Sequence, residues 1–267
     1  MNHRSAFLTS ALILIVTLGV AGHDTWLAPR RTFVKRHSKM LLDLTSGMSF
    51  PLLDTSIKKD RIDVARCRLN GKVEGIARLM SAPNSLLLEE SFNEAGIATC
   101  WVELKPRQLE LTEKQVEEYF AEIDASPSVR ESWANMKAPK RWRELYVKHA
   151  KTFSYIGSTG KDQSWSEPVG MALEIVPDKN PATIKPGDAF SVRVLKDGTP
   201  LANFPVSIVF AEDPHSEVQS TDSEGRATFR IERAGKYLIR GTDLRPSTKP
   251  DLEWESDFTT LTIQVRK

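Results

Sequence analysis

The residues best suited to chemistry lie at the end of an apolar leader. Residues 6–20 form a charge-free, mostly apolar run after Arg4, and small residues then lead to His23 and Asp24. This is the layout of a secretory signal peptide over residues 1–22. Cleavage after Gly22 makes His23 the first residue, so its α-amine and imidazole can chelate one metal ion. Such nitrogen donors suit Ni, Co, Cu or Zn better than Ca or Mg.

Further ligands for this metal are few. Asp24 can add an oxygen ligand or orient the ring of His23. His149 lies on the apolar stripe of an expected helix and is the best second imidazole if the N-terminus packs nearby. The predicted metal site is therefore His23, Asp24 and His149. Three alternatives stay open: His149 is a hydrogen-bonded core residue, His23 begins a loose end, or cleavage after Ala21 leaves a different chelate.

Composition and charge exclude several classes of function. Lys and Arg number 37 against 35 Asp and Glu, with no block of five like charges, so no nucleic-acid surface is indicated. The sequence contains no GxSxG, P-loop, HExxH or dinucleotide-binding motif, so no enzyme class is predicted. No apolar run after residue 22 is long enough to span a membrane. We expect a periplasmic or secreted protein without a membrane span in its mature chain.

The chain has two cysteines, Cys67 and Cys100. In an oxidising compartment, two cysteines in the same half of a chain most simply form one disulfide. A thiolate metal site is the alternative, but neither a CxxC spacing nor a nearby histidine supports it. The pair is interpreted as structural.

Short β segments and a helical insertion are expected in the first half. Turn-forming residues separate partly alternating runs at Met40–Leu44, Arg61–Leu69, Ser85–Glu90 and Ala98–Leu104. A capping box at Thr112–Gln115 and the pair Ser126–Pro127 then predict two helix starts. A third helix is expected after Pro139, because Trp142, Leu145, Tyr146, His149 and Phe153 recur at helical spacing. The helical insertion is thus placed at residues 112–155.

The second half returns to strands. Six candidates are Met171–Val176, Phe190–Leu195, Val206–Phe210, Arg226–Ile231, Lys236–Gly241 and Phe258–Val265. Their spacing and turn residues match an immunoglobulin-like sandwich. The predicted fold is all-β with a helical insertion and two β-sandwich (immunoglobulin-like) domains. Residues 1–22 are the signal peptide, 23–170 the N-terminal β domain with its insertion, and 171–267 the second sandwich.

Several segments together resemble an exported bacterial family of uncharacterised domains, often labelled a periplasmic component of cobalt or nickel uptake or a nickel-uptake substrate-specific region. The segments that carry the resemblance are His23-Asp24-Thr25-Trp26-Leu27, Glu144-Leu145-Tyr146, Lys148-His149-Ala150-Lys151, Leu173-Glu174-Ile175-Val176-Pro177, Lys196-Asp197-Gly198-Thr199-Pro200-Leu201, Trp254-Glu255-Ser256 and Leu261-Thr262. The most specific is the first, although Thr25 stands where the family is expected to have an aromatic residue.

The resemblance implies a periplasmic protein that binds a divalent transition metal (Ni or Co, with Cu as a further option), with His23 at the matching ligand position. A membrane transporter component is the implied partner for the ion. The chain is poor in histidines, however, so a role in transport does not follow. Two other functions compete with this one: an adhesive or interaction module without metal, and a copper enzyme with a histidine-brace-like site formed by His23 and His149.

Overall fold

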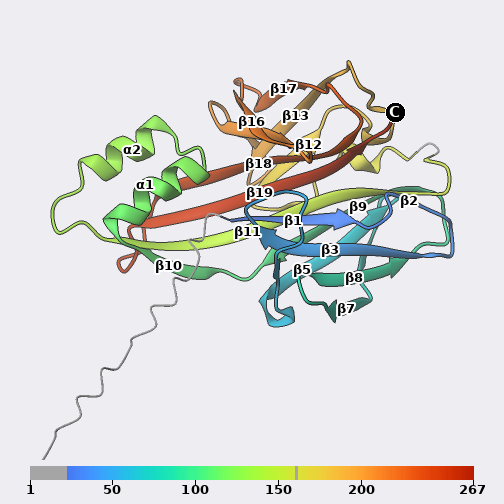
Figure 1. Ribbon diagram of the computed structural model, residues 1–267, viewed down its shortest axis with the longest axis horizontal. Helices are drawn as coiled ribbons and strands as arrows, with labels where there is room; N and C mark the ends of the chain where they lie inside the picture. Colours follow the sequence, from blue (N-terminus) through green and yellow to red (C-terminus); the bar gives the residue numbers. More distant parts are fainter. Residues whose placement is uncertain (1–22, 160–161) are drawn as a thin grey trace, which may run out of the picture.

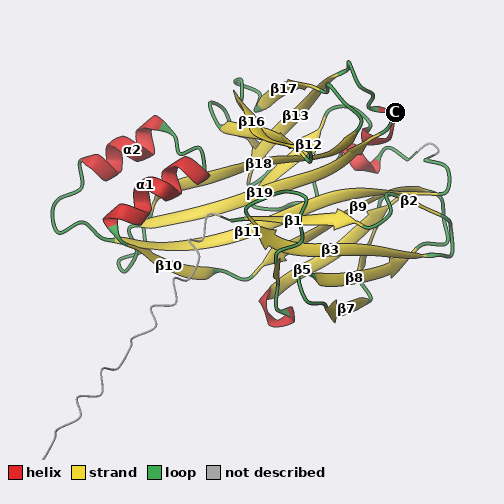
Figure 2. Cartoon of the chain, in the orientation of Figure 1, coloured by secondary structure: helices red, strands yellow, loops and turns green. Residues whose placement is uncertain are grey.

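The computed structural model describes residues 23–159 and 162–267 and is built mostly from β-strands (Figures 1 and 2). The strands form sheets of ten, five and four members, and two α-helices lie at one end of the largest sheet. The predicted class, all-β with a helical insertion and sandwich-like packing of sheets, is confirmed. The predicted signal peptide lies outside the described residues.

The ten-stranded sheet is the centre of the molecule. Its main path, in spatial order, is β16 (Asp213–Ser220), β15 (Pro205–Phe210), β18 (Gly235–Pro246), β19 (Trp254–Val265), β11 (Trp142–Ile156), β9 (Gly96–Leu104), β5 (Ile62–Leu69) and β6 (Lys72–Gly75). Two further strands, β10 (Arg107–Leu111) and β2 (Phe33–Val34), pair with β11. The central pair, β11 and β19, runs parallel, although the paired residues lie more than a hundred positions apart in the sequence.

The two smaller sheets pack on this central one. The five-stranded sheet contains β1 (Asp24–Pro29), β3 (Lys39–Gly47), β4 (Thr55–Ser56), β7 (Arg78–Ser81) and β8 (Leu86–Ser91). The four-stranded sheet contains β12 (Leu173–Pro177), β13 (Ala189–Lys196), β14 (Thr199–Pro200) and β17 (Arg226–Arg230). Short 3₁₀ turns lie at Lys59–Arg61, Ser164–Ser166 and Pro181–Thr183.

Alternation along β11 explains how both faces of the central sheet are covered. Ala150 and Ile156 join the core shared with the five-stranded sheet, whereas Phe153 joins the core shared with the four-stranded sheet. Successive side chains of a strand point to opposite faces, so the two smaller sheets cover opposite sides. The result is two sandwich-like cores that share one sheet. The pairing of β11 with β19 crosses the predicted domain boundary at residue 170. The division into two domains stays a prediction.

Two of the expected helices are confirmed. Helix α1 (Glu113–Glu122) begins with the capping box of Thr112 and Gln115, and α2 (Pro127–Ala134) begins at the Ser126 cap with proline in its first turn. Their apolar faces cover the end of the central sheet, where Trp142 stacks on Trp254 at 4.7 Å between ring centroids. The helices therefore seal one end of the sheet rather than forming a core of their own.

The prediction of a third helix is wrong. Residues 142–156 form the fifteen-residue strand β11, so the helical insertion ends with α2. The segment satisfies both a helical stripe and a two-residue period, because its apolar residues are dense and its polar residues Glu144 and Lys151 are also buried. Strands on both sides of β11 supply backbone hydrogen bonds over its length, and this tertiary pairing overrides the local pattern.

A buried carboxylate ties the helices to the sheet. The Tyr119 hydroxyl donates to Glu144 Oε1 at 2.7 Å, and Trp142 Nε1 donates to Oε2 at 2.8 Å. The Ser256 hydroxyl also donates to Oε1. Burial raises the pKa of Glu144, and these three donors oppose that rise. The carboxylate is fully paired from α1, β11 and β19.

Tyr119→Phe is therefore expected to cost about 1.5–3 kcal/mol of stability, because a buried carboxylate loses one donor while the ring packing is kept. Urea unfolding monitored by tryptophan fluorescence measures the change. Tyr146→Phe is the matched control, since the structure gives its hydroxyl no hydrogen-bond partner among the described residues, and its cost should stay within about 0.5 kcal/mol. Equal costs for the two variants would contradict the anchoring role of Tyr119.

The remaining expectations for the core are largely confirmed. Cys67 and Cys100 form a disulfide between β5 and β9, where they are direct partners across the two strands. Each of the ten predicted strand segments overlaps an observed strand. Besides β11, several strands among the described residues were not predicted. Among them, β1, β10 and β16 carry the N-terminal site, the helix connection and one edge of the central sheet, and the others are the short strands β2, β4, β6, β7 and β14.

Candidate functional site

The predicted N-terminal residue lies at the start of a firmly held strand. His23 immediately precedes β1, which pairs with β3 from Asp24↔Gly47 to Pro29↔Leu42. The Thr25 hydroxyl lies 2.8 Å from that of Ser46, and its carbonyl accepts from the Thr260 hydroxyl at 2.7 Å. From Asp24 onward the chain is therefore a paired strand and not the loose end that was the alternative for His23. The β-forming residues Thr25, Trp26 and Leu27 are the signal that could have predicted this strand.

Lys148 forms a hydrogen bond to the backbone of His23. Its ammonium donates to the His23 carbonyl at 2.5 Å from the neighbouring strand β11. The Lys148 side chain is buried, with the rings of Phe258 and Tyr146 at 5.1 and 5.6 Å from its nitrogen. Burial lowers the pKa of Lys148 to about 8, against the opposing effect of Asp24. Sequence reasoning missed this residue; a lysine within a long apolar segment is the signal that could have shown it.

The imidazole of His23 is held toward its neutral form. Partial burial and the positive charge of Lys148 lower its pKa, and the carboxylates of Asp54 and Asp24 only partly offset them. The neutral ring is the form that binds metal ions. Asp54 belongs to the loop between β3 and β4, so a second carboxylate besides Asp24 acts on the ring.

Asp24 is engaged by an arginine. Its carboxylate forms an ion pair with Arg240 of β18, on the central sheet. Glu122 and Asp124, at the end of α1, line the same small cavity, and burial raises the pKa of both. Asp24 therefore helps to fix the start of β1 against the central sheet, and Asp54 is the freer acid near His23.

His149 faces away from this region. It follows Lys148 directly on β11, and successive side chains of a strand point to opposite faces. Its Nε2 lies 3.3 Å from Asp257 Oδ1, and its Nδ1 lies 3.2 Å from Glu103 Oε2 without the angle of a hydrogen bond. Burial alone would lower the pKa of His149, but these two carboxylates outweigh it and raise the pKa. The structure thus separates His149 from His23 by the thickness of the sheet.

The donors near His23 fit a small chelate rather than a side-chain cage. Among residues 23–159 and 162–267, no group of three or more His, Cys, Asp or Glu side chains is arranged to hold a metal ion. His23 itself offers its imidazole and, if the predicted cleavage after Gly22 occurs, its α-amine. Asp54 can add an oxygen. The chemistry of this set fits a transition metal. His23 and Asp24 stay predicted ligands, whereas the structure does not bring His149 together with them, because its ring lies on the opposite face of β11.

Comparison with known families decides the relationship of the chain. The model of the Domain of unknown function (DUF4198) matches residues 20–242, which is most of the sequence. The chain belongs to this family. The predicted resemblance to a family of uncharacterised domains is confirmed at that level, and DUF4198 membership by itself assigns neither metal nor transport.

Other comparisons add little for this DUF4198 protein. No curated protein matches its sequence significantly. Among solved structures, the D0-D1 domain of Intimin is 13% identical with a TM-score of 0.21, covering 90% of this chain and 97% of that one. Murine CEACAM1b is 10% identical with a TM-score of 0.22, covering 91% and 99%. TM-scores this low carry no argument about shared architecture or function. No helix within the described ranges is long and apolar enough to cross a membrane.

Proposed function

We propose that this DUF4198 protein is exported and binds a divalent transition metal, Ni or Co with Cu as a further option, through the imidazole and α-amine of His23 once the leader is removed. The observation that carries the proposal is the position of His23, which immediately precedes the fixed strand β1. Because β1 is held by β3 and Thr260, a chelate at its start costs little ordering. The lowered pKa of the His23 imidazole favours the ligating form at neutral pH.

The surroundings of His23 also support this role. The negative charge of Asp54 acts on the His23 ring, and the ion pair with Arg240 holds Asp24 in a mostly buried position. The Lys148 ammonium faces the carbonyl of His23. We also propose that the protein releases the ion to a membrane transporter component, because an ion bound at the N-terminus of the mature chain is accessible for transfer.

The test is a metal titration of exported protein whose N-terminus has been determined by mass spectrometry. Wild type should bind one Ni²⁺ or Cu²⁺, and His23→Ala should weaken binding by at least about 100-fold. His215→Ala is the matched control, because this imidazole is exposed on β16, where its charged neighbour is Asp213. One extra alanine ahead of His23 should also weaken binding, since it displaces the α-amine.

Three results would overturn the proposal: equal stoichiometry and affinity in wild type and His23→Ala, loss of binding in His215→Ala instead, or a mature chain that begins well beyond His23. Peroxide production by the copper-loaded protein would instead favour an enzyme. The pH dependence of binding gives an independent check, because protons compete for both nitrogen donors and affinity should fall as the pH drops below the amine pKa of about 8.

A further inference from the structure

Strand β18 extends beyond its outer neighbour. On one side, β18 pairs with β19 over its whole length, from Gly235↔Val265 to Pro246↔Trp254. On the other side, β15 pairs only with residues 237–240. Within the described part of the chain, no strand pairs with the outer edge of residues 241–246. The central sheet therefore has an internal step where a strand edge is left open.

The chain that leads into β15 turns from this edge after contacting its first residue, Gly241, through the Phe204 ring and the Pro205 carbonyl. Phe204 donates its N–H to the Thr221 hydroxyl at 2.9 Å and accepts from the Thr221 N–H at 3.0 Å. Asn203 donates to the Thr221 carbonyl at 2.9 Å. These bonds direct residues 203–204 toward the end of β16. Pairing of β15 with β18 consequently stops at Ser207↔Arg240.

The free backbone groups on the edge can be assigned from the strand's alternation. At one end of β18 the Lys236 carbonyl bonds Ala211 on the β15 side, and just beyond the other end the Ser247 N–H bonds Glu253 on the β19 side. The register with β19 is uninterrupted, so even-numbered residues face outward throughout. Thr242 and Leu244 thus present an N–H and a carbonyl each, and Pro246 presents a carbonyl.

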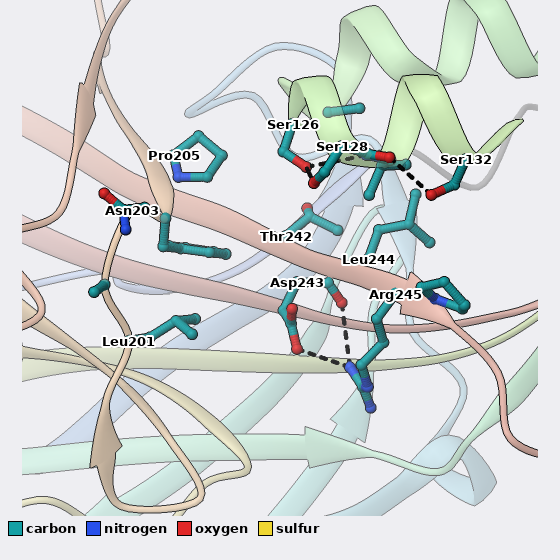
Figure 3. Close-up of a pocket in the computed structure, with 15 residues that line it drawn as sticks. Ser126, Ser128, Ser132, Leu201, Asn203, Pro205, Thr242, Asp243, Leu244 and Arg245 are labelled. Atoms are coloured by element: carbon teal, nitrogen blue, oxygen red, sulfur yellow. Dashed lines mark hydrogen bonds and ion pairs between the residues drawn. The ribbon is translucent and has the colours of Figure 1, made fainter. Parts of the chain in front are cut away.

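A groove runs along this edge (Figure 3). Its volume is about 360 Å³, and its walls are α2, the loop 201–205 and the edge of β18 itself. Ser126, Ser128 and Ser132 line the helix side, with Thr242 and Leu244 pointing toward them, while Asp243 and Arg245 point to the opposite side. This space suits one extended segment and is too small for another sheet.

The two sides of the groove favour different side chains. On the helix side, serine hydroxyls and the apolar surface of Val129 and Leu244 accept small apolar or hydroxyl residues. On the other side, the Arg245 side chain is 39% exposed. It is ion-paired with Asp243 at 2.8 Å and with Asp257 at 2.9 Å, whose side chains are only 20% and 6% exposed. The more accessible charge is positive, so an acidic residue opposite Arg245 is favoured.

We propose that the open edge of β18 binds an extended segment of a partner protein as an added strand. The segment would alternate small apolar residues, directed toward α2, with acidic residues directed toward Arg245. Its backbone would bond to Thr242 and Leu244, as in strand addition at the edge of other sheets. This interaction surface is separate from His23 and does not depend on the proposed metal site.

The test uses the pentapeptide Val-Glu-Val-Glu-Val, labelled with fluorescein, in a polarisation titration of the full mature chain. Three comparisons separate edge pairing from other binding. Val-Lys-Val-Lys-Val should bind at least about tenfold more weakly, and so should the acidic peptide with N-methylated valines. Thr242→Pro removes an outward N–H and should weaken binding about tenfold, whereas Thr242→Val should not.

A further pair of variants tests the groove itself. Ser128→Trp should block binding by filling the space beneath α2, whereas Glu131→Trp, at an exposed position that does not line the groove, should leave it unchanged. Amide exchange at Thr242 and Leu244 should be fast in the free protein and slow with peptide bound. Absence of binding at about 1 mM peptide, or equal binding of the N-methylated peptide, would overturn the proposal. So would a dimer in light scattering that Thr242→Pro dissociates, because a second copy would then occupy the edge.

Discussion

Replacing Asp257 by asparagine is expected to lower the free energy of unfolding by about 3–5 kcal/mol, because it removes the buried carboxylate that pairs with His149, Lys196 and Arg245. The Asp257 carboxylate contacts His149 at 3.3 Å and Arg245 at 2.9 Å, and it also forms an ion pair with Lys196. Its side chain is only 6% exposed, so water has little access to the carboxylate. The network joins β19, β11, β18 and β13 through one residue.

The pH dependence of this network has a defined sign. Burial would raise the pKa of Asp257, but the hydrogen bonds from His149 and Lys196 outweigh it and hold the pKa far below its usual value. Its contribution is therefore present above about pH 4 and is lost as the pH falls toward the folded pKa. The pKa of His149 is raised, so its contribution is present below about pH 6.5 and is lost as the pH rises through the folded value.

Urea unfolding of wild type and Asp257→Asn at about pH 5.5 and about pH 8 measures both effects. The wild type should lose stability between the two pH values, and the variant should lose less, because His149 then has only Glu103 as an acidic partner. Asp63→Asn, at an exposed position on β5, is the control and should change stability by no more than about 0.5 kcal/mol. A similar pH slope in the wild type and Asp257→Asn would show that His149 does not titrate against Asp257.

The sequence predicted the parts of the fold that local chemistry decides. Capping residues fix the starts of α1 and α2, since a hydroxyl beside free amide donors acts within four residues. Turn residues separated the strands for the same reason: Asn70 adopts positive φ in the turn between β5 and β6. The disulfide followed from the presence of two cysteines and the predicted compartment.

Long-range pairing could not be predicted in this way. The parallel contact between β11 and β19 joins residues more than a hundred positions apart, and no local pattern encodes it. Because of this pairing, the segment expected to be a helix is a strand, and His149 lies on the face opposite His23. A period count cannot separate these outcomes when polar residues such as Glu144 and Lys148 are buried with partners, because the pattern then ceases to report exposure.

For the candidate site, the sequence could indicate His23 and Asp24 but not their environment. Lys148 and Asp54 act on the His23 imidazole from strands and loops that come together only in the fold. The arginine partner of Asp24 comes from β18, at the other end of the chain. Ligand types could therefore be predicted, whereas the charge around them required the sheet topology.

Lys151→Met is expected to cost about 3–5 kcal/mol, because it leaves the Glu174 carboxylate buried without its cation. Lys151 Nζ lies 2.6 Å from Glu174 Oε1, and both side chains are 2% exposed or less. Burial would raise the pKa of Glu174, but Lys151 and the N–H groups of Val169 and Gly170 outweigh it and lower the pKa. The lysine belongs to β11 and the glutamate to β12, so the pair links the regions on either side of residue 170.

Thermal and urea unfolding of three variants would separate the ion pair from packing. Lys179→Met is the matched control: its ion pair with Asp188 has the same 2.6 Å separation, but the side chains are 42% and 31% exposed, so its loss should cost less than about 1 kcal/mol. The double variant Lys151→Met/Glu174→Gln should recover much of the lost stability, because no buried charge remains unpaired.

The shape of the unfolding transition decides what this pair does for the whole chain. Because β11 pairs with β19 and Lys151 pairs with Glu174, unfolding either region exposes apolar surface and buried charge in the other. Wild type should therefore unfold in one transition, and Lys151→Met should lower its midpoint without splitting it. Two separate transitions in the wild type would instead mean that the regions before and after residue 170 fold independently, and equal costs for Lys151→Met and Lys179→Met would show that burial does not set the strength of the pair.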